Sequence, residues 1–189
     1  MRKFILIVLV VILSGCASLE NIEYQGEDAG YLVITSIIGQ GAQRDGSYII
    51  MFRESANYQA SHRLYYSPGN LFYAKPPDFT NHEGKGFVHI VKLKPGSYQL
   101  HRWYAANNNW SVSPDEYVVT EFEVFPSKTT YGGAYIFKPF KGKNLLGMSV
   151  FGGLEFVPSP DIDRDHEIAV AKKPEISSLE LINAKSGSR

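Results

Sequence analysis

Short segments rich in aromatic and β-branched residues recur along the chain, and each is bounded by glycine, proline, asparagine or aspartate. We expect strands at residues 31–38, 47–53, 63–66, 71–74, 87–93, 98–105, 117–125, 129–137 and 147–157. Aromatic residues make up 13% of the chain, and their side chains suit a pleated, half-buried surface. The series predicts an all-β fold, an antiparallel β-sandwich of seven or more strands, with an eight-stranded barrel as the alternative.

Turn residues refine this prediction. Pro95 and Gly96 suit a tight turn, so we expect residues 87–93 and 98–105 to form a hairpin in which His89 could face His101. Residues 31–38 are apolar on both faces, which is typical of a covered strand. The glycine pairs at 132–133 and 152–153 indicate bulges or close backbone approaches, and residues 75–85 an exposed loop.

The C-terminal part changes from strand to helix character. Asp161 can cap a helix, the segment from Ile162 supplies apolar residues, and Lys172 suits a helix C-terminus. Pro174 then ends the helix. We therefore expect one C-terminal helix at about Ile162–Lys172, followed by a short edge strand near residues 178–182 and a frayed tail.

The N-terminus has the organisation of a secretory signal peptide. Arg2 and Lys3 precede an apolar run at residues 4–13, which is too short to span a bilayer as a helix. Leu13, Ser14, Gly15 and Cys16 then resemble the lipobox of bacterial lipoproteins, in which the cysteine is acylated and becomes the first mature residue. Cys16 is the only cysteine of the chain, and acylation would account for a lone thiol in an exported protein.

The lipobox implies a domain organisation and a location. We expect a signal peptide at residues 1–15, a lipidated polar tether at 16–29, a β-sandwich at 30–160 and a C-terminal helix and tail at 161–189. Ala17 and Ser18 follow the cysteine, without the aspartate that favours inner-membrane retention in this class. This implies the bacterial outer membrane, facing the periplasm, with the acyl chains as the contact with the bilayer.

Two turns carry a second resemblance. Leu93-Lys94-Pro95-Gly96-Ser97-Tyr98 precedes one strand, and Phe125-Pro126-Ser127-Lys128-Thr129-Thr130-Tyr131-Gly132-Gly133 leads into another. They resemble the turns of uncharacterised bacterial lipoproteins of the DUF2846 type, although Ser127 stands where that family prefers glycine. The resemblance covers residues 30–137 and implies a β-sandwich similar to transthyretin-like and carboxypeptidase-regulatory modules. It brings no active site.

Charge and motif content argue against several functions. The chain has 19 basic and 19 acidic residues, and 17 against 19 once Arg2 and Lys3 leave with the signal peptide, so no basic field is present to attract nucleic acid or anionic lipid. The five histidines lack metal-ligand spacing, and no G-x-S-x-G elbow occurs. The aspartates at 161, 163 and 165 imitate a calcium loop, but His166 and Lys172 occupy positions that need glycine and glutamate. We expect no catalytic residues, no metal and no cofactor.

One loop region is a candidate binding surface. Its residues are aromatic rings and amides that could bind a sugar or anchor a protein partner, unless the aromatic residues belong to the core. They are Trp103, Tyr104, Asn107, Asn108, Asn109 and Trp110.

The sequence thus favours a non-enzymatic, membrane-anchored envelope lipoprotein that acts through protein contacts or as a structural or accessory subunit. The alternative is a module that binds glycan, peptidoglycan fragments or lipid through residues 103–111. An enzyme whose site is assembled from distant residues is the third hypothesis.

Overall fold

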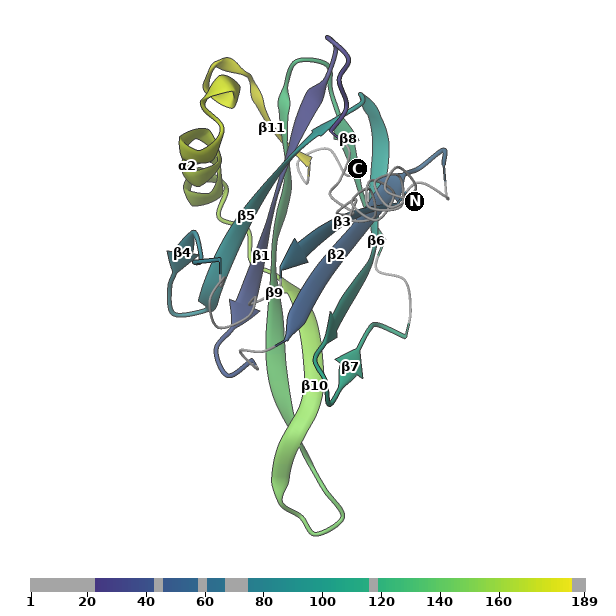
Figure 1. Ribbon diagram of the computed structural model, residues 1–189, viewed down its shortest axis with the longest axis vertical. Helices are drawn as coiled ribbons and strands as arrows, with labels where there is room; N and C mark the ends of the chain where they lie inside the picture. The colour runs from purple at the N-terminus through teal and green to yellow at the C-terminus, as the bar shows by residue number, and fades with distance from the viewer. Residues whose placement is uncertain (1–22, 43–45, 58–60, 67–74, 116–118, 185–189) are drawn as a thin grey trace, which may run out of the picture.

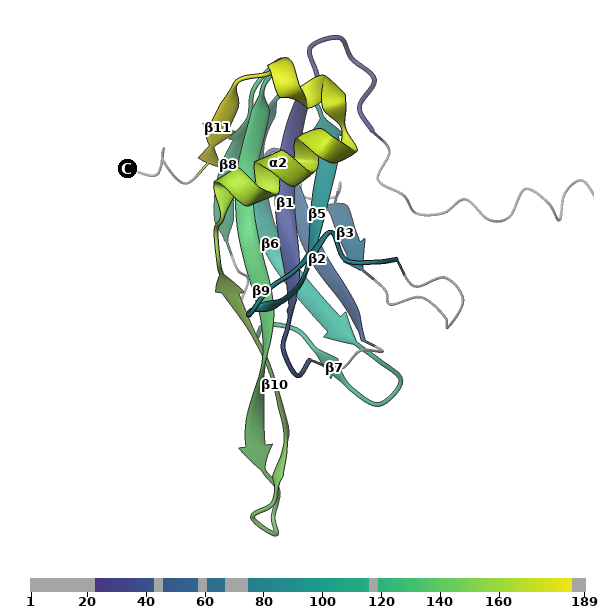
Figure 2. The same cartoon turned by 90° about the vertical axis from the view of Figure 1, so that its left-hand side faces the viewer.

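A computed structural model describes residues 23–42, 46–57, 61–66, 75–115 and 119–184 of the chain. These residues form two β-sheets packed face to face, with one α-helix on the outer face of the larger sheet (Figures 1 and 2). The predicted β-sandwich with a C-terminal helix is confirmed. The expected signal peptide, the lipobox residues 13–16 and the expected strand at 71–74 lie outside the described ranges.

The larger sheet has six strands and the smaller has five. The larger has the order β10 (Ser149–Pro158), β9 (Thr129–Lys143), β1 (Gly30–Gly39), β5 (Gly84–Leu93) and β4 (Phe79–Thr80), with β11 (Leu181–Asn183) also paired to β9. The smaller has the order β3 (Ser61–Tyr66), β2 (Ser47–Glu54), β6 (Gly96–Ala106) and β7 (Ser111–Val112), with β8 (Thr120–Val124) also paired to β6.

The sandwich is not wholly antiparallel. β1 and β9 run parallel, as do β11 and β9, whereas the other described pairs are antiparallel. A parallel pair needs a long crossover, and here the chain between β1 and β9 builds the whole second sheet on the way. β1 is buried along its entire length, as expected for a covered strand, because the second sheet lies on one face and the helix packs on the other.

The expected hairpin across Pro95 and Gly96 is wrong. β5 pairs with β1 and β4 in the larger sheet, while β6 pairs with β2, β7 and β8 in the smaller one. The turn therefore carries the chain from one sheet to the other, and Gly96 takes a φ of +153° there. As a result, His89 and His101 lie in different sheets and do not face each other across a hairpin.

The core between the sheets is aromatic and aliphatic. On β1, Leu32, Ile34 and Ile38 point into it, and they meet side chains such as Phe52 and Trp103 from the smaller sheet. The alternate residues of β1 point the other way, toward the helix, because successive side chains of a strand lie on opposite faces. The two faces of β1 thus contribute side chains to two separate apolar layers.

The helix α2 spans Ile162–Lys172, as the sequence predicts. Asp161 caps it, since its Oδ1 accepts a hydrogen bond of 3.3 Å from the Arg164 N–H. At the other end, Lys172 Nζ donates to Asp78 Oδ2 at 2.8 Å and to the Val88 carbonyl at 2.7 Å. The 3₁₀ helix η1 (Pro174–Ser178) and β11 follow, so the C-terminal part packs on the sandwich.

Both expected glycine bulges are present. The register of β1 against β9 shifts at Gly132, and that of β10 against β9 shifts at Gly152. Gly133 and Gly153 have φ values of +102° and +144°, which disfavour any side chain.

Two expected boundaries change. Residues 75–85 are not only a loop, since they include β4 and the start of β5. The expected tether also ends earlier than residue 29, because the Tyr24 N–H donates to the Lys92 carbonyl and Ala29 is buried. From Glu23 onward the chain is therefore part of the folded body.

Candidate functional site

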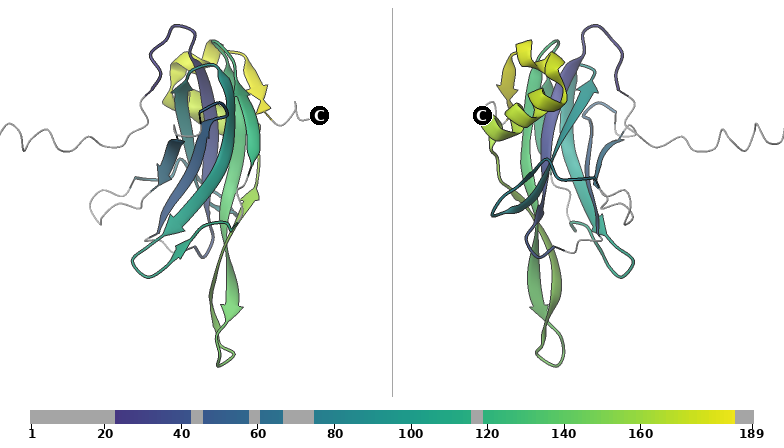
Figure 3. Two further views of the ribbon diagram at one scale, coloured as in Figure 1. Left: turned by 90° about the vertical axis from the view of Figure 1, so that its right-hand side faces the viewer. Right: turned by 60° about the vertical axis from the view of Figure 1, so that its left-hand side comes forward.

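A two-stranded arm formed by β9 and β10 projects from the body at the end away from α2 (Figures 1 and 3). The last pairing of β1 with β9 is between Ile38 and Phe137, so β9 beyond Phe137 pairs only with β10. We call residues 138–155 the arm. The sequence predicted strands at 129–137 and 147–157 but gave no sign that β9 continues to Lys143 as a free ribbon.

The arm carries most of the exposed apolar side chains. Leu145 is 107% exposed, Leu146 80% and Met148 55%. Phe140 and Val150, farther from the end of the arm, are 44% and 40% exposed. Only Tyr65 and Val119 are comparably exposed among the other large apolar residues of the described chain. Contiguous exposed apolar groups usually mark a contact site, so the tip, residues 144–148, is the strongest candidate surface.

The tip folds on itself through one asparagine. Asn144 Oδ1 accepts hydrogen bonds of 3.0 Å from the N–H groups of Leu146 and Met148. The Asn144 N–H donates to the Met148 carbonyl at 3.0 Å, and the Gly147 N–H donates to the Asn144 carbonyl at 2.9 Å. Four N–H groups of the tip, those of Asn144, Leu146, Gly147 and Met148, are thus paired internally, while the side chains of Leu145, Leu146 and Met148 are exposed.

The base of the arm is packed against the body. The Phe140 ring covers Gly152 and Gly153, where a Cβ would come within 3.0 Å of ring atoms. On the other strand, the Phe151 ring lies 5.0 Å from that of Trp110, between centroids. The Phe140 contact joins the two strands of the arm to each other, whereas the contact between Phe151 and Trp110 fixes the arm on the sandwich.

Trp103 is not a surface residue. It is 3% exposed, and its ring stacks on Phe156 with centroids 5.7 Å apart and meets Phe137 edge-on at 5.8 Å. A bulge in β6 is the cause, since the register against β2 skips His101. Simple alternation from the buried Leu100 would turn Trp103 outward, and the extra residue turns it inward. Its place in the expected binding surface is wrong.

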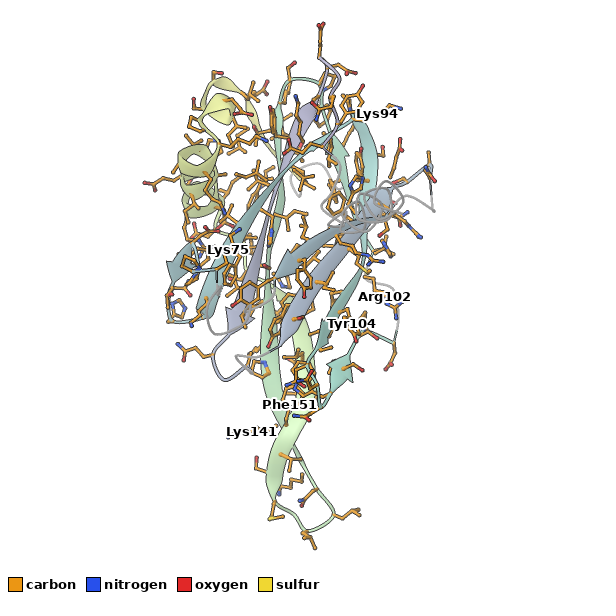
Figure 4. All side chains as sticks on the ribbon, viewed as in Figure 1. Lys75, Lys94, Arg102, Tyr104, Lys141 and Phe151 are labelled. Carbon is orange, nitrogen blue, oxygen red and sulfur yellow. The ribbon has the colours of Figure 1, made fainter. Side chains whose placement is uncertain are left out.

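The other members of that group do not form one surface either. Tyr104 follows Trp103 on β6 and is partly exposed, whereas Trp110 turns toward the arm and packs on Phe151 (Figure 4). Asn107 Oδ1 accepts from the N–H groups of Asn109 and Trp110 at 2.8 and 3.1 Å, and Asn108 and Asn109 are exposed. Asn107 thus shapes the β6–β7 turn, as expected of an Asx turn.

Ser36 and His89 form the closest approach to a catalytic pair in the described residues. Ser36 Oγ lies 2.9 Å from His89 Nε2, and burial, with help from Lys172, lowers the pKa of His89 to about 4. Ser36 is only 3% exposed, however, and β1 is hydrogen-bonded on both sides, so its N–H groups are committed to the sheet. A serine nucleophile needs access and free N–H donors, so this pair is a core hydrogen bond.

The described residues contain no group of three or more histidine, cysteine, aspartate or glutamate side chains that could hold a metal. His62 stacks on Phe52 at 4.8 Å, and His101 Nε2 lies 3.3 Å from Ser61 Oγ. Asp161 serves as the helix cap, and Asp165 is fully buried. The three aspartates therefore do not converge on one point.

A cavity of about 250 Å³ opens beside the end of β1. Gly39, Gly41, Tyr48 and Tyr66 are among its walls, and Lys85 is the only charged group among the described residues that line it. It offers no acid–base pair to a substrate.

No described helix has the length and apolar character needed to cross a bilayer. No protein-family model, curated protein or solved structure matches this chain.

Proposed function

We propose that this protein is a membrane-anchored envelope lipoprotein whose β-sandwich is a non-catalytic contact module. It acts as an accessory component of the envelope, anchored through acylated Cys16 and using the arm to touch another component. The observation that carries the proposal is the exposed apolar tip, with Leu145 at 107% and Leu146 at 80% exposure on a ribbon held away from the body.

The shape of the arm supports a contact role. An isolated two-stranded ribbon is marginally stable in water, and leaving leucines exposed at its end gains nothing for folding. Here the aromatic residues at the base of the arm, Phe140 and Phe151, provide the packing, whereas Leu145, Leu146 and Met148 make no comparable contact. Their apolar surface becomes favourable only when another molecule covers it.

The interior of the sandwich supports a non-catalytic role. Two of its buried polar side chains are used for structure: Ser36 Oγ lies 2.9 Å from His89 Nε2, and Thr130 Oγ1 donates to the Glu123 carbonyl at 2.8 Å.

Site-specific photo-cross-linking in intact cells tests the contact. A photoreactive amino acid replaces Leu146 in the full chain, and the same residue at Val119 is the control, because Val119 is 60% exposed on the body. We expect light-dependent adducts from position 146 and none from position 119. Equal labelling of the two positions, or no adduct at 146, contradicts the proposal.

A further inference from the structure

We propose that the tip of the arm inserts into the surface of an anionic lipid bilayer. This rests on the proposed function in taking the arm as the contact element, and it names the class of partner. Three features of the arm carry it: its backbone hydrogen bonds, its charges, and the spacing between its charges and its apolar tip.

The first feature is the internal pairing of three successive N–H groups of the tip. The N–H groups of Leu146, Gly147 and Met148 all donate within the tip, to Asn144. Entering an apolar phase is costly for a loop because unpaired N–H groups lose their hydrogen bonds to water. These three N–H groups stay hydrogen-bonded whether or not water is present. The leucine side chains can therefore leave water without leaving these three N–H groups unpaired.

The second feature is the sign of the charge on the arm. Lys138, Lys141 and Lys143 are exposed on β9, and the only acidic residue of the arm, Glu155, lies opposite Lys138 in the strand register at the base. Without Arg2 and Lys3 the chain has 17 basic and 19 acidic residues, a net charge of −2, so the distal arm is a local cationic element on a weakly acidic protein. Lysines beside an anionic lipid surface are attracted to it, each adding to the affinity.

The third feature is spacing. Lys143, the last residue of β9, precedes Leu145 by two residues, so the two lie at most about 7 Å apart along the chain. Interfacial segments bury apolar side chains roughly 5–10 Å into the boundary between headgroups and acyl chains. When Leu145 and Leu146 reach that depth, Lys143 and Lys141, the exposed lysines of β9 that precede them, lie nearer to the phosphates than the two leucines do.

The composition of the tip favours lipid over a protein partner. Energetically dominant residues of protein interfaces are enriched in tryptophan, tyrosine and arginine, and lysine is depleted there. The tip and its flanks have none of the favoured three and two nearby lysines.

The position of the tether predicts how the body would lie. The Tyr24 N–H donates to the Lys92 carbonyl, and in the larger sheet Lys92 and Thr129 are the two strand partners of Tyr31. Tyr24 therefore lies near Thr129, at the start of β9. From there to Lys143 is roughly 45 Å of strand, whereas eight residues from Cys16 to Tyr24 span at most about 28 Å. Anchor and tip reach one bilayer only when the long axis of the domain is tilted well away from the membrane normal.

Depth-dependent fluorescence quenching tests the insertion. The acylated full-length mature protein with Leu146→Cys is labelled with an environment-sensitive fluorophore, since acylation leaves position 146 as the only free thiol. It is incorporated into vesicles of phosphatidylcholine alone or mixed equally with phosphatidylglycerol, with and without nitroxide-labelled lipid. Val119→Cys carries the same label as the control.

We expect a blue-shifted emission and nitroxide quenching at position 146 in the anionic vesicles, and neither at position 119. Lys141→Glu with Lys143→Glu abolishes the shift at 146, because each lysine lost reduces partitioning about fivefold and each glutamate adds repulsion. Lys75→Glu with Lys94→Glu makes the same charge change on the body and leaves the shift intact (Figure 4).

An emission at 146 that is the same in anionic vesicles as in buffer overturns the inference, as does an equal response to the two charge-reversed pairs. A light-induced protein adduct at 146 without any lipid quenching would leave the proposed contact function standing and remove the lipid assignment.

Discussion

The Tyr131 hydroxyl donates a hydrogen bond of 2.7 Å to Asp165 Oδ2, which ties β9 to α2 at a point closed to solvent. Burial, followed by the bond to Asp165, raises the pKa of Tyr131 above its ordinary value, so the hydroxyl keeps its proton. Arg164 Nε donates to Asp165 Oδ1 at 2.8 Å, and the Arg164 guanidinium covers the Phe79 ring. A buried carboxylate is tolerable only with such partners.

Removing this link should loosen the helix. We expect Asp165→Ala to lower the free energy of unfolding by about 3 kcal/mol, because Arg164 and Tyr131 lose their partner, and Tyr131→Phe to lower it by about 1–2 kcal/mol. Asp163→Ala, in the same helical turn but exposed, should change it by less than about 0.5 kcal/mol. Urea unfolding at pH 7 measures all three, and equal effects of Asp163→Ala and Asp165→Ala would contradict the buried link.

His89 should make the fold sensitive to acid. Its pKa in the folded protein is about 4, below the ordinary 6.5, mainly because of burial. The unfolded chain therefore binds more protons between these values, so the stability from neutral His89 is complete above pH 6.5 and is lost as the pH falls toward 4. The loss should be on the order of 2 kcal/mol, less than the full shift implies, because His89 keeps some exposure.

Urea midpoints at pH 7, 5 and 4 measure this loss. His89→Gln should flatten the dependence in that window, whereas His82→Gln, at an exposed position, should leave it unchanged. If wild type and His89→Gln lose stability in parallel, His89 is not the source.

The two tryptophans should behave differently. Trp103→Ala should cost about 3–5 kcal/mol, since it leaves a cavity in the core, whereas Trp110→Ala should cost roughly 1–2 kcal/mol because that ring is only partly buried. In Trp110→Phe, the remaining Trp103 should emit at short wavelength and resist acrylamide quenching. Strong quenching of this variant would show that Trp103 is accessible after all.

Cys16 should control where the protein is found. We expect Cys16→Ser to leave the membrane fraction and to lose incorporation of labelled palmitate, because the acyl chains supply the anchor. Cell fractionation and metabolic labelling measure both, with Ser18→Ala as a control next to the lipobox. A wild-type protein that takes up no palmitate, with a Cys16→Ser variant that still sediments with membranes, removes the anchor from the proposal.

Local sequence chemistry is enough for several elements. Asp161 and Pro174 bracket the helix because capping and termination depend on neighbouring residues, and the glycine pairs mark bulges for the same reason. In β8, Phe122 and Val124 are buried and Glu121 and Glu123 exposed, which the alternation predicts.

Which strands pair with one another, and on which face of a strand each side chain lies, depend on distant parts of the chain. Pro95-Gly96 suits a hairpin and a crossover equally well, and the choice is made by which sheet has room for each strand. Trp103 faces inward because of one bulged residue that no periodicity shows. The arm could not be predicted from the sequence for a related reason. The pattern of apolar residues does not distinguish a leucine that packs in the core from one that remains exposed, such as Leu145.

The parallel pairing of β1 with β9 affects how the chain folds. β1 is the first strand of the described part of the chain and carries no charge from Gly30 to Gly39, yet its partners lie at residues 84–93 and 129–137. Contacts so distant in sequence form slowly, and meanwhile this segment is able to self-associate. A nascent or truncated chain ending before Thr129 leaves one edge of β1 open, so it should need a holding chaperone or aggregate.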